Sequence, residues 1–125
     1  MTHARRTPSE RAGLVYKVVS AAEWHAAGAS GFYGGSPDDI RDGFIHLSCA
    51  HQLAGTLAKY FRGNGTLVLI AFSAADLGPG LTFEASRGGD LFPHLYGPLP
   101  TAPALWQRPL QLGADLVPVV DEEWL

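Results

Sequence analysis

His46 is the residue whose type and neighbours most directly suggest binding or catalysis. It lies in the segment GFIHLSC, residues 43–49, where strand alternation places Phe44, His46 and Ser48 on one face and apolar residues on the other. A predicted helix begins directly afterwards, and the free amide groups at a helix start favour anions such as phosphate. His46 and Ser48 are therefore candidates to bind a phosphate or a ribose hydroxyl. The alternative is a core histidine whose ring is satisfied by a backbone carbonyl.

A second group of polar side chains lies in the run EASRGGDLFPHLYGPLP, residues 84–100. Arg87 offers a planar fork for phosphate or carboxylate, and Glu84 offers an acceptor for a sugar hydroxyl or an acid/base group. His94 and Tyr96 share one face of a predicted strand. These four side chains are predicted to surround a small anionic ligand. The alternative is an exposed loop in which Glu84 and Arg87 form a weak surface ion pair.

The segment GASGFYGGSP, residues 28–37, is predicted to be a loop with Phe32 and Tyr33 at its tip. Its glycines would supply hinge freedom, and its aromatic rings would offer a surface on which a flat ring stacks. Ordinary packing over the core is the alternative for both rings. The glycine-rich phosphate motifs GxGxxG and GxxxxGK[ST] are absent, which argues against a Rossmann or P-loop enzyme.

Metal binding and nucleophilic catalysis by a thiol are weaker hypotheses. His46, His51, His94 and Glu84 are suitable metal ligands, but the sequence has neither HExxH nor a CxxC pair, so no metal is expected. Cys49 falls on the apolar side of its predicted strand, where burial keeps the pKa of a thiol high.

Six strands and two helices are expected to position these residues. The apolar run at 66–72 is typical of a central strand, whereas Pro93 and Pro109 favour sheet edges for the strands that contain them. Ser20 and Glu23 have capping-box spacing, so a short helix should follow Ser20 and end at Gly28. The expected strands are 14–19, 43–49, 66–72, 81–85, 91–96 and 105–112, and the expected helices are 21–27 and 50–61.

Length and charge restrict the possible classes of protein. The chain has 125 residues, which suits one globular domain over residues 14–125 after a flexible leader over residues 1–13. The formal net charge is -3, and no basic run exceeds Arg5–Arg6, so a surface for duplex nucleic acid is not expected. A single cysteine gives no disulfide, and no apolar stretch reaches membrane-spanning length, so the cytoplasm is the expected compartment.

The motifs LVYKVV, DGFIHLS, LVLIAF and the run from Glu84 through PHLYGPL resemble the bacterial family designated domain of unknown function 952 (DUF952). The resemblance covers residues 14 to about 117. It implies an α+β fold similar to a compact ADP-ribosyltransferase domain, with two small, mostly antiparallel sheets and two or three short helices around a central cleft that binds NAD. By position, Tyr16 or Lys17, then His46, then Glu84 or His94 would match the residues that line the nicotinamide and ribose pocket.

The resemblance implies a transferase that acts on NAD or a related nucleotide, by ADP-ribosyl or 2'-phosphate chemistry. His46, Glu84, Arg87 and His94 are the expected catalytic residues. The alternative is a non-catalytic nucleotide-binding module, which the absence of a His-Gly pair in the first strand favours. In both cases the expected partner is a small nucleotide-like molecule, bound with the help of Tyr16, Lys17, Tyr33, Ser48 and Tyr96.

Overall fold

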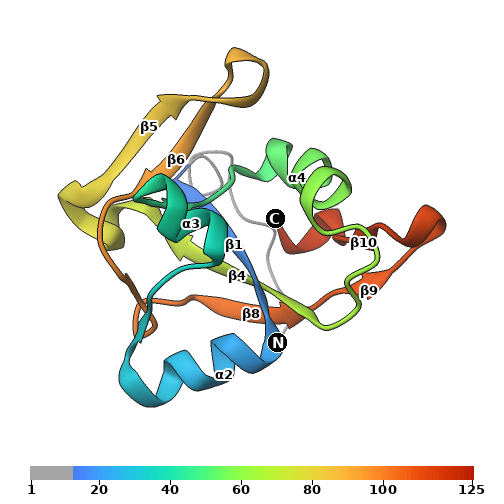
Figure 1. The fold of residues 1–125 in the computed structure, drawn as a ribbon, viewed down its shortest axis with the longest axis horizontal. Coiled ribbons are helices and arrows are strands. Elements are labelled where there is room, and N and C mark those ends of the chain that lie inside the picture. The colour runs from blue at the N-terminus through green and yellow to red at the C-terminus, as the bar shows by residue number, and fades with distance from the viewer. Residues whose placement is uncertain (1–12) are drawn as a thin grey trace.

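Two three-stranded antiparallel sheets form the frame of the chain, which a computed structural model describes over residues 13–125 (Figure 1). The first sheet has the order β1-β4-β8, the second has the order β3-β6-β5, and β2–β7 and β9–β10 are short ribbons. The expected α+β class, with small antiparallel sheets and a few helices, is confirmed. The strands are β1 (Leu14–Ser20), β2 (Phe32–Tyr33), β3 (Ile45–His46), β4 (Leu67–Ser73), β5 (Leu81–Ala85), β6 (Leu91–Leu95), β7 (Leu99–Pro100), β8 (Trp106–Pro109), β9 (Gln111–Leu112) and β10 (Pro118–Val119).

The α-helices of this part of the chain are α2 (Ala21–Ser30), α3 (Pro37–Asp42) and α4 (Leu53–Tyr60). Residues 1–12 of the predicted leader lie outside the described residues. The division into a leader and one domain over residues 14–125 therefore stays a prediction.

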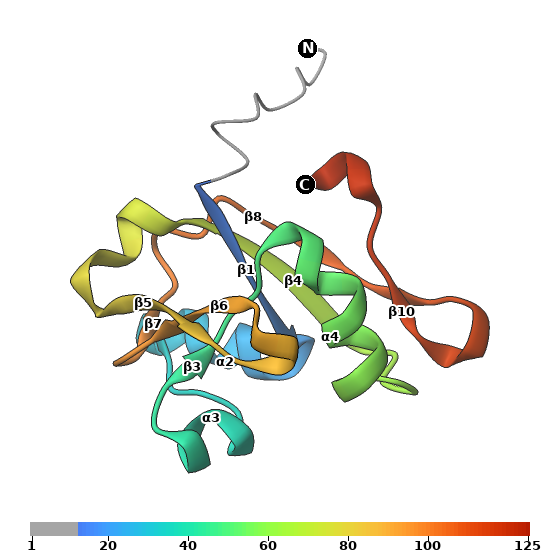
Figure 2. The ribbon, with the colours of Figure 1, turned by 90° about the horizontal axis from the view of Figure 1, so that it is seen from above.

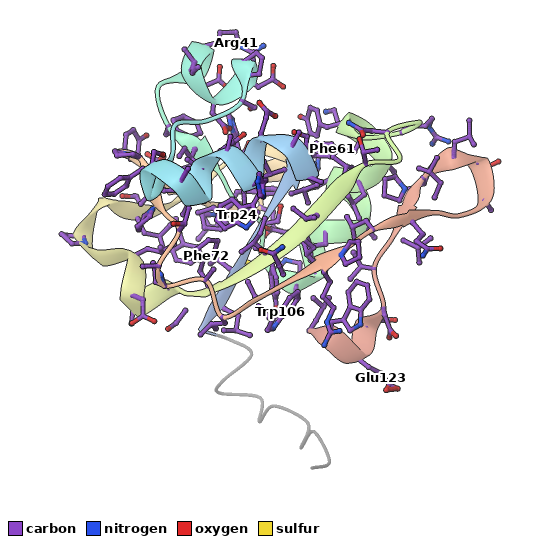
Figure 3. All side chains as sticks on the ribbon, turned by 90° about the horizontal axis from the view of Figure 1, so that it is seen from below. Trp24, Arg41, Phe61, Phe72, Trp106 and Glu123 are labelled. Carbon is purple, nitrogen blue, oxygen red and sulfur yellow. The ribbon has the colours of Figure 1, made fainter. Side chains whose placement is uncertain are left out.

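β4 is the central strand of the first sheet, as its apolar sequence predicts. Its first six residues are all buried, because helices cover both faces of the sheet. Trp24 of α2 packs on one face, where its ring meets that of Phe72 edge-on with centroids 6.2 Å apart (Figure 3). Leu53 and Leu57 of α4 pack on the other face.

α2 begins where it was predicted to begin but ends later. The Ser20 hydroxyl accepts a hydrogen bond from the Glu23 backbone N–H at 3.2 Å, which caps the helix. The predicted end at Gly28 is wrong, because the helix continues to Ser30 and the left-handed cap is Gly31, with φ of 89°. A helix tolerates an interior glycine at a cost of about 1 kcal/mol, so Gly28 does not stop it.

The predicted loop over residues 28–37 contains regular structure. Phe32 and Tyr33 form β2, which pairs with β7, and Tyr33 is buried in the core beside Trp24 instead of standing at a loop tip. The helix α3, which was not predicted, begins directly after Ser36 and lies beside β3 (Figure 2). Residues 28–37 therefore do not form an aromatic lid.

The second sheet differs from prediction at both β3 and β6. The strand expected over residues 43–49 is limited to Ile45–His46, although Ser48 forms an isolated bridge with Tyr16 of β1 and so joins the two sheets. β6 is the central strand of its sheet, so the edge position expected from Pro93 is wrong. β3 pairs with β6 only at residues 94 and 95 of β6. Pro93, which has no backbone N–H to donate, therefore lies where this ladder ends.

The remaining elements follow the prediction with changes at their ends. The helix expected over residues 50–61 is a 3₁₀ turn, η1 (Ala50–Gln52), followed by α4. The strand expected over residues 105–112 divides into β8 and β9, and β10 follows, so it is not the last strand. β8 is an edge strand, as Pro109 predicts.

Candidate functional site

A polar pocket of about 200 Å³ lies where the two sheets approach each other. Its walls come from β1, α3, the segment that begins with β3, α4, the loop before β6, and β6 itself. Six of the nine residues predicted from the sequence to form a site line this one pocket: Tyr16, Lys17, His46, Ser48, Arg87 and His94.

His46 is held by the buried carboxylate of Asp39. Asp39 Oδ1 accepts hydrogen bonds from the backbone N–H of His46 at 3.0 Å and from its Nδ1 at 2.6 Å. Because a carboxylate only accepts, the Nδ1 nitrogen carries the proton in this contact. The backbone and the ring of His46 are thus fixed by a single oxygen atom.

The other oxygen of Asp39 binds Lys17 and the start of α3. Asp39 Oδ2 lies 3.0 Å from Lys17 Nζ and accepts a hydrogen bond from the Ser36 backbone N–H at 2.9 Å. Lys17 also donates to the carbonyl oxygen of His46 at 2.8 Å. The Lys17 and Asp39 side chains are only 6% and 2% exposed, so this is a buried ion pair whose two members both contact His46.

Burial alone would raise the pKa of Asp39, but the hydrogen bond from His46 and the charge of Lys17 outweigh burial and hold the pKa well below its usual value. Burial lowers the pKa of Lys17, and the charge and the hydrogen bond of Asp39 act against that lowering. The carboxylate is therefore the ionised, proton-accepting member of this network.

A second carboxylate approaches the other side of the His46 ring. Asp42 Oδ2 lies 2.9 Å from His46 Nε2, and Asp42 also pairs with Arg41, whose Nε lies 2.9 Å from Oδ1. Asp42 is one-third exposed, and Arg41 points outward from α3 (Figure 3). This side of the pocket is therefore acidic and partly open to water.

His94 stands directly across from His46 on the neighbouring strand, with ring centroids 5.6 Å apart. Its Nδ1 donates to Glu84 Oε1 at 2.8 Å, and the Tyr96 hydroxyl donates to the same oxygen at 2.8 Å. The hydrogen bonds from His94 and Tyr96 lower the pKa of Glu84, and the bond to Glu84 raises the pKa of Tyr96. Phe44 stacks on the His94 ring at 4.0 Å, so this imidazole is fixed in both position and plane.

Arg87 supplies the positive charge at the other end of the pocket. One of its terminal nitrogens lies 3.3 Å from Thr56 Oγ1, and its guanidinium lies over the Phe92 ring at 4.8 Å. Thr56 Oγ1 is in turn 3.2 Å from Ser48 Oγ. Among the described residues no carboxylate pairs with Arg87, so its charge is available to an anion next to two hydroxyl groups.

The loop that carries Arg87 is braced by a buried glutamine. Gln52 Nε2 donates at 2.8 Å both to Asp90 Oδ2 and to the carbonyl oxygen of Leu91. Its Oε1 accepts from the Cys49 backbone N–H at 2.8 Å. These bonds connect the start of the helical segment to the loop and hold Arg87 against α4.

Three of the predicted site residues do not line the pocket. Tyr33 is 5% exposed within the core, because β2 pairs with β7 and turns this ring toward α2. Glu84 and Tyr96 do not line the pocket. Glu84 binds Nδ1 of His94, and Tyr96 donates to Glu84. The surface ion pair between Glu84 and Arg87, given above as the alternative, does not form because Glu84 binds His94 instead.

The most important residue that the sequence prediction missed is Asp39. The signal was present in the sequence SPDD, where Ser36 and Asp39 have the spacing of a capping box and Pro37 suits the first turn of a helix. The glycines of residues 28–37 favour a loop instead and so obscure this helix signal. Asp38, Asp42 and Thr56 also line the pocket and were not predicted.

The structure gives no support to a metal site or to catalysis by the Cys49 thiol. Within residues 13–125 there is no group of three or more His, Cys, Asp or Glu side chains arranged to hold a metal ion. Burial, and then the charge of Asp90, raise the pKa of the Cys49 thiol, which disfavours a reactive thiolate.

Within residues 13–125, no helix is both long enough and apolar enough to span a bilayer.

Three solved structures of one bacterial protein have the same small α+β fold as this chain. The X-ray structure of protein CC0527 from Caulobacter crescentus is 52% identical in sequence, with a TM-score of 0.83 over 85% of this chain and 93% of that chain. An X-ray structure of a double mutant of CC0527 is 51% identical, with a TM-score of 0.82 over the same shares of both chains. The solution NMR structure of CC0527 is 52% identical, with a TM-score of 0.76 over 85% of this chain and 91% of that one.

The family model described as protein of unknown function (DUF952) matches residues 18–107, and the chain belongs to this family. The match includes Asp39, His46, Arg87 and His94 and begins directly after Lys17. No curated protein matches the chain.

Proposed function

We propose that the chain is a transferase that acts on NAD or a related nucleotide, by ADP-ribosyl or 2'-phosphate chemistry, in this pocket. The observation that carries the proposal is that His46, Arg87 and His94 line one pocket although they come from different elements. The pocket thus combines a guanidinium, two oriented imidazoles and two hydroxyl groups. These are groups that bind a ribose bearing a phosphate.

Arg87 would hold the phosphate. Its guanidinium is anchored on Thr56 and Phe92 and, within the described residues, is not neutralised by a carboxylate. The hydroxyl groups of Thr56 and Ser48 lie on the same side and can donate to further phosphate oxygens. The pocket volume is below the range of about 300–1,000 Å³ that is common for whole drug-sized ligands. It would therefore enclose the ribose and its phosphate, with the remainder of a dinucleotide outside.

His94 would be the proton acceptor. Glu84 takes the proton-bearing Nδ1, which leaves Nε2 of the neutral ring as an acceptor. Within hydrogen-bond distance of a ribose hydroxyl or of an incoming nucleophile, this nitrogen would remove a proton. Glu84 itself would act through His94, since it does not line the pocket.

Breaking the bond between ribose and nicotinamide develops positive charge on the ribose, and fixed negative charges nearby stabilise that state. Asp38 and Asp42 line the α3 side of the pocket and, although each also pairs with Arg41, would supply negative charge there. The two ends of the pocket therefore suit the two charges of the reacting nucleotide, an anionic phosphate and a ribose that becomes cationic.

The second candidate is a binding module that holds a nucleotide without reacting. One observation favours it: Glu84 Oε1 is engaged by both His94 and Tyr96 instead of facing the ligand. A transferase whose catalytic carboxylate has withdrawn in this way would retain binding and lose turnover.

Isothermal calorimetry with NAD, together with an assay of nicotinamide release, tests the proposal. Wild-type protein should bind NAD and release nicotinamide, Arg87→Ala should weaken binding at least about tenfold, and His94→Ala should reduce release more than binding. Arg62→Ala, which removes an exposed arginine outside the pocket, is the matched control. Binding without release selects the module. Neither heat nor release at millimolar NAD overturns both candidates.

A further inference from the structure

The two carboxylates that approach His46 differ in how firmly they are held. Asp39 is 2% exposed and accepts hydrogen bonds at both oxygens from Ser36, Lys17 and His46. Asp42 is 33% exposed and also pairs with Arg41. Asp39 therefore cannot leave His46 without leaving a buried lysine unpaired, whereas Asp42 can leave and keep an ion pair.

Folding stability alone does not explain the buried pair of Lys17 and Asp39. Removing two charges from water is costly, and apolar residues of similar size often stabilise a fold as well or better. What this pair does locally is to fix His46 at three atoms, its backbone N, its carbonyl O and its Nδ1. With Nδ1 fixed as a donor, the only ring nitrogen left for a ligand is Nε2, and His46 lines the pocket.

We propose that Asp39 is a positioning residue that fixes the tautomer and direction of His46, and that Asp42 occupies the place of a ligand oxygen at His46 Nε2. A ribose hydroxyl displaces Asp42, which then keeps its contact with Arg41, and because a hydroxyl both donates and accepts, it can bond to Nε2 with or without a proton on that nitrogen. Asp38 and Asp39 disfavour an anionic ligand group on the α3 side of the pocket, so the anionic group of the ligand lies at Arg87. This assignment of the ligand rests on the proposed function, whereas the assignment of Asp39 does not.

The tautomer of His46 tests the role of Asp39 without any ligand. In ¹⁵N-labelled wild-type protein, two-bond proton–nitrogen correlations should show a proton on Nδ1 of His46. A Lys17→Met, Asp39→Ala double variant leaves no buried charge unpaired, and in it the proton should move to Nε2 in a substantial fraction of molecules. Asp76→Ala, which removes an exposed carboxylate outside the pocket, should leave the tautomer unchanged. A wild-type His46 ring without a proton on Nδ1, or a double variant in which Nδ1 keeps its proton in all molecules, overturns the role of Asp39.

Calorimetric titration with ADP-ribose tests the displacement of Asp42, because two aspartates three positions apart on one helix should have opposite effects. Asp42→Ala removes the competing acceptor and should tighten binding about fivefold, the equivalent of one net hydrogen bond. The double variant should weaken it about tenfold or more, because the imidazole is no longer fixed. Unchanged or weaker binding by Asp42→Ala overturns the displacement. If neither wild type nor Asp42→Ala binds ADP-ribose, the displacement and the proposed ligand fail together, while the tautomer still decides the role of Asp39.

Discussion

His46 and His94 form a cross-strand pair in which each imidazole has a carboxylate on Nδ1. Asp39 binds the first ring and Glu84 binds the second. A carboxylate at this nitrogen fixes the tautomer and leaves Nε2 as the working atom. The two carboxylates differ in environment, because Asp39 is buried against Lys17 whereas Glu84 is 38% exposed. The same local design thus anchors the partly exposed ring of His46 on a buried carboxylate and the buried ring of His94 on a partly exposed one.

Acid should weaken the fold partly through Asp39. The pKa of this carboxyl is lower in the folded chain than its usual value of 3.8, so the unfolded chain binds more protons in acid. The stabilisation from Asp39 is therefore present above about pH 4 and is lost as the pH falls further.

Urea unfolding between about pH 2.5 and about pH 7 measures this effect, because that range extends roughly one unit below and three units above an ordinary aspartate pKa. The free energy of unfolding should fall more steeply below about pH 4 in the wild type than in the Lys17→Met, Asp39→Ala double variant. Other carboxylates are common to both proteins, so the comparison isolates Asp39. Parallel curves would show that the buried pair contributes nothing to acid sensitivity.

At the scale of elements, α3 is the part of the fold that builds the acidic wall. The helix has only six residues and depends on its cap, in which Ser36 and Asp39 bind each other's backbone N–H. The backbone that leads into it turns at Gly35, which has φ of 115°, and a Cβ there would lie 2.9 Å from Asp39 Cβ. The direction of the chain before α3 thus determines where the Asp39 carboxylate lies.

Gly35→Ala should therefore destabilise the protein by about 1–3 kcal/mol, from a strained backbone and a clash with Asp39. Gly34→Ala is the matched control, because a Cβ at Gly34 meets nothing within 4 Å. Chemical denaturation of the two variants measures the difference. Equal stabilities would mean that the turn before α3 does not constrain Asp39.

The elements also show where sequence reasoning succeeds and where it fails. Periodicity predicted β1, β4, β5 and the α4 region because each is a run with a single clear pattern. It failed for residues 28–42, where glycines mark a helix cap and turns around short elements instead of one long loop. It also failed at Pro93, because a proline is tolerated in a central strand where one neighbour's ladder ends. Both failures depend on tertiary pairing that a local pattern does not contain.

At the scale of the whole molecule, the pocket depends on how the two sheets are joined. The bridge between Tyr16 and Ser48 consists of two backbone hydrogen bonds of 2.8 and 2.9 Å. α4 packs on the first sheet through Leu53 and Leu57 and carries Thr56 into the pocket. The meeting of His46, His94 and Arg87 was predicted from residue types, but Asp39 enters only because α3 folds back against β1 and β3.

Leu57→Ala should lower the free energy of unfolding by about 2–5 kcal/mol, because Leu57 is 1% exposed between α4 and the sheet. Leu116→Ala, at a side chain that is 59% exposed, should change it by less than about 0.5 kcal/mol. Equilibrium unfolding in guanidinium chloride compares the two variants. A similar loss in both would contradict the described core.

Titration of ¹⁵N-labelled protein with NAD, followed by NMR, tests most directly whether the pocket is a nucleotide site. The backbone signals of Lys17, His46, Ser48, Thr56 and Arg87 should shift together along one binding curve, while signals from Glu123, which is remote from α3 (Figure 3), stay in place. Free nicotinamide should accumulate in the proton spectrum of the same sample. An unchanged spectrum at millimolar NAD, or shifts confined to residues outside the pocket, would contradict the account.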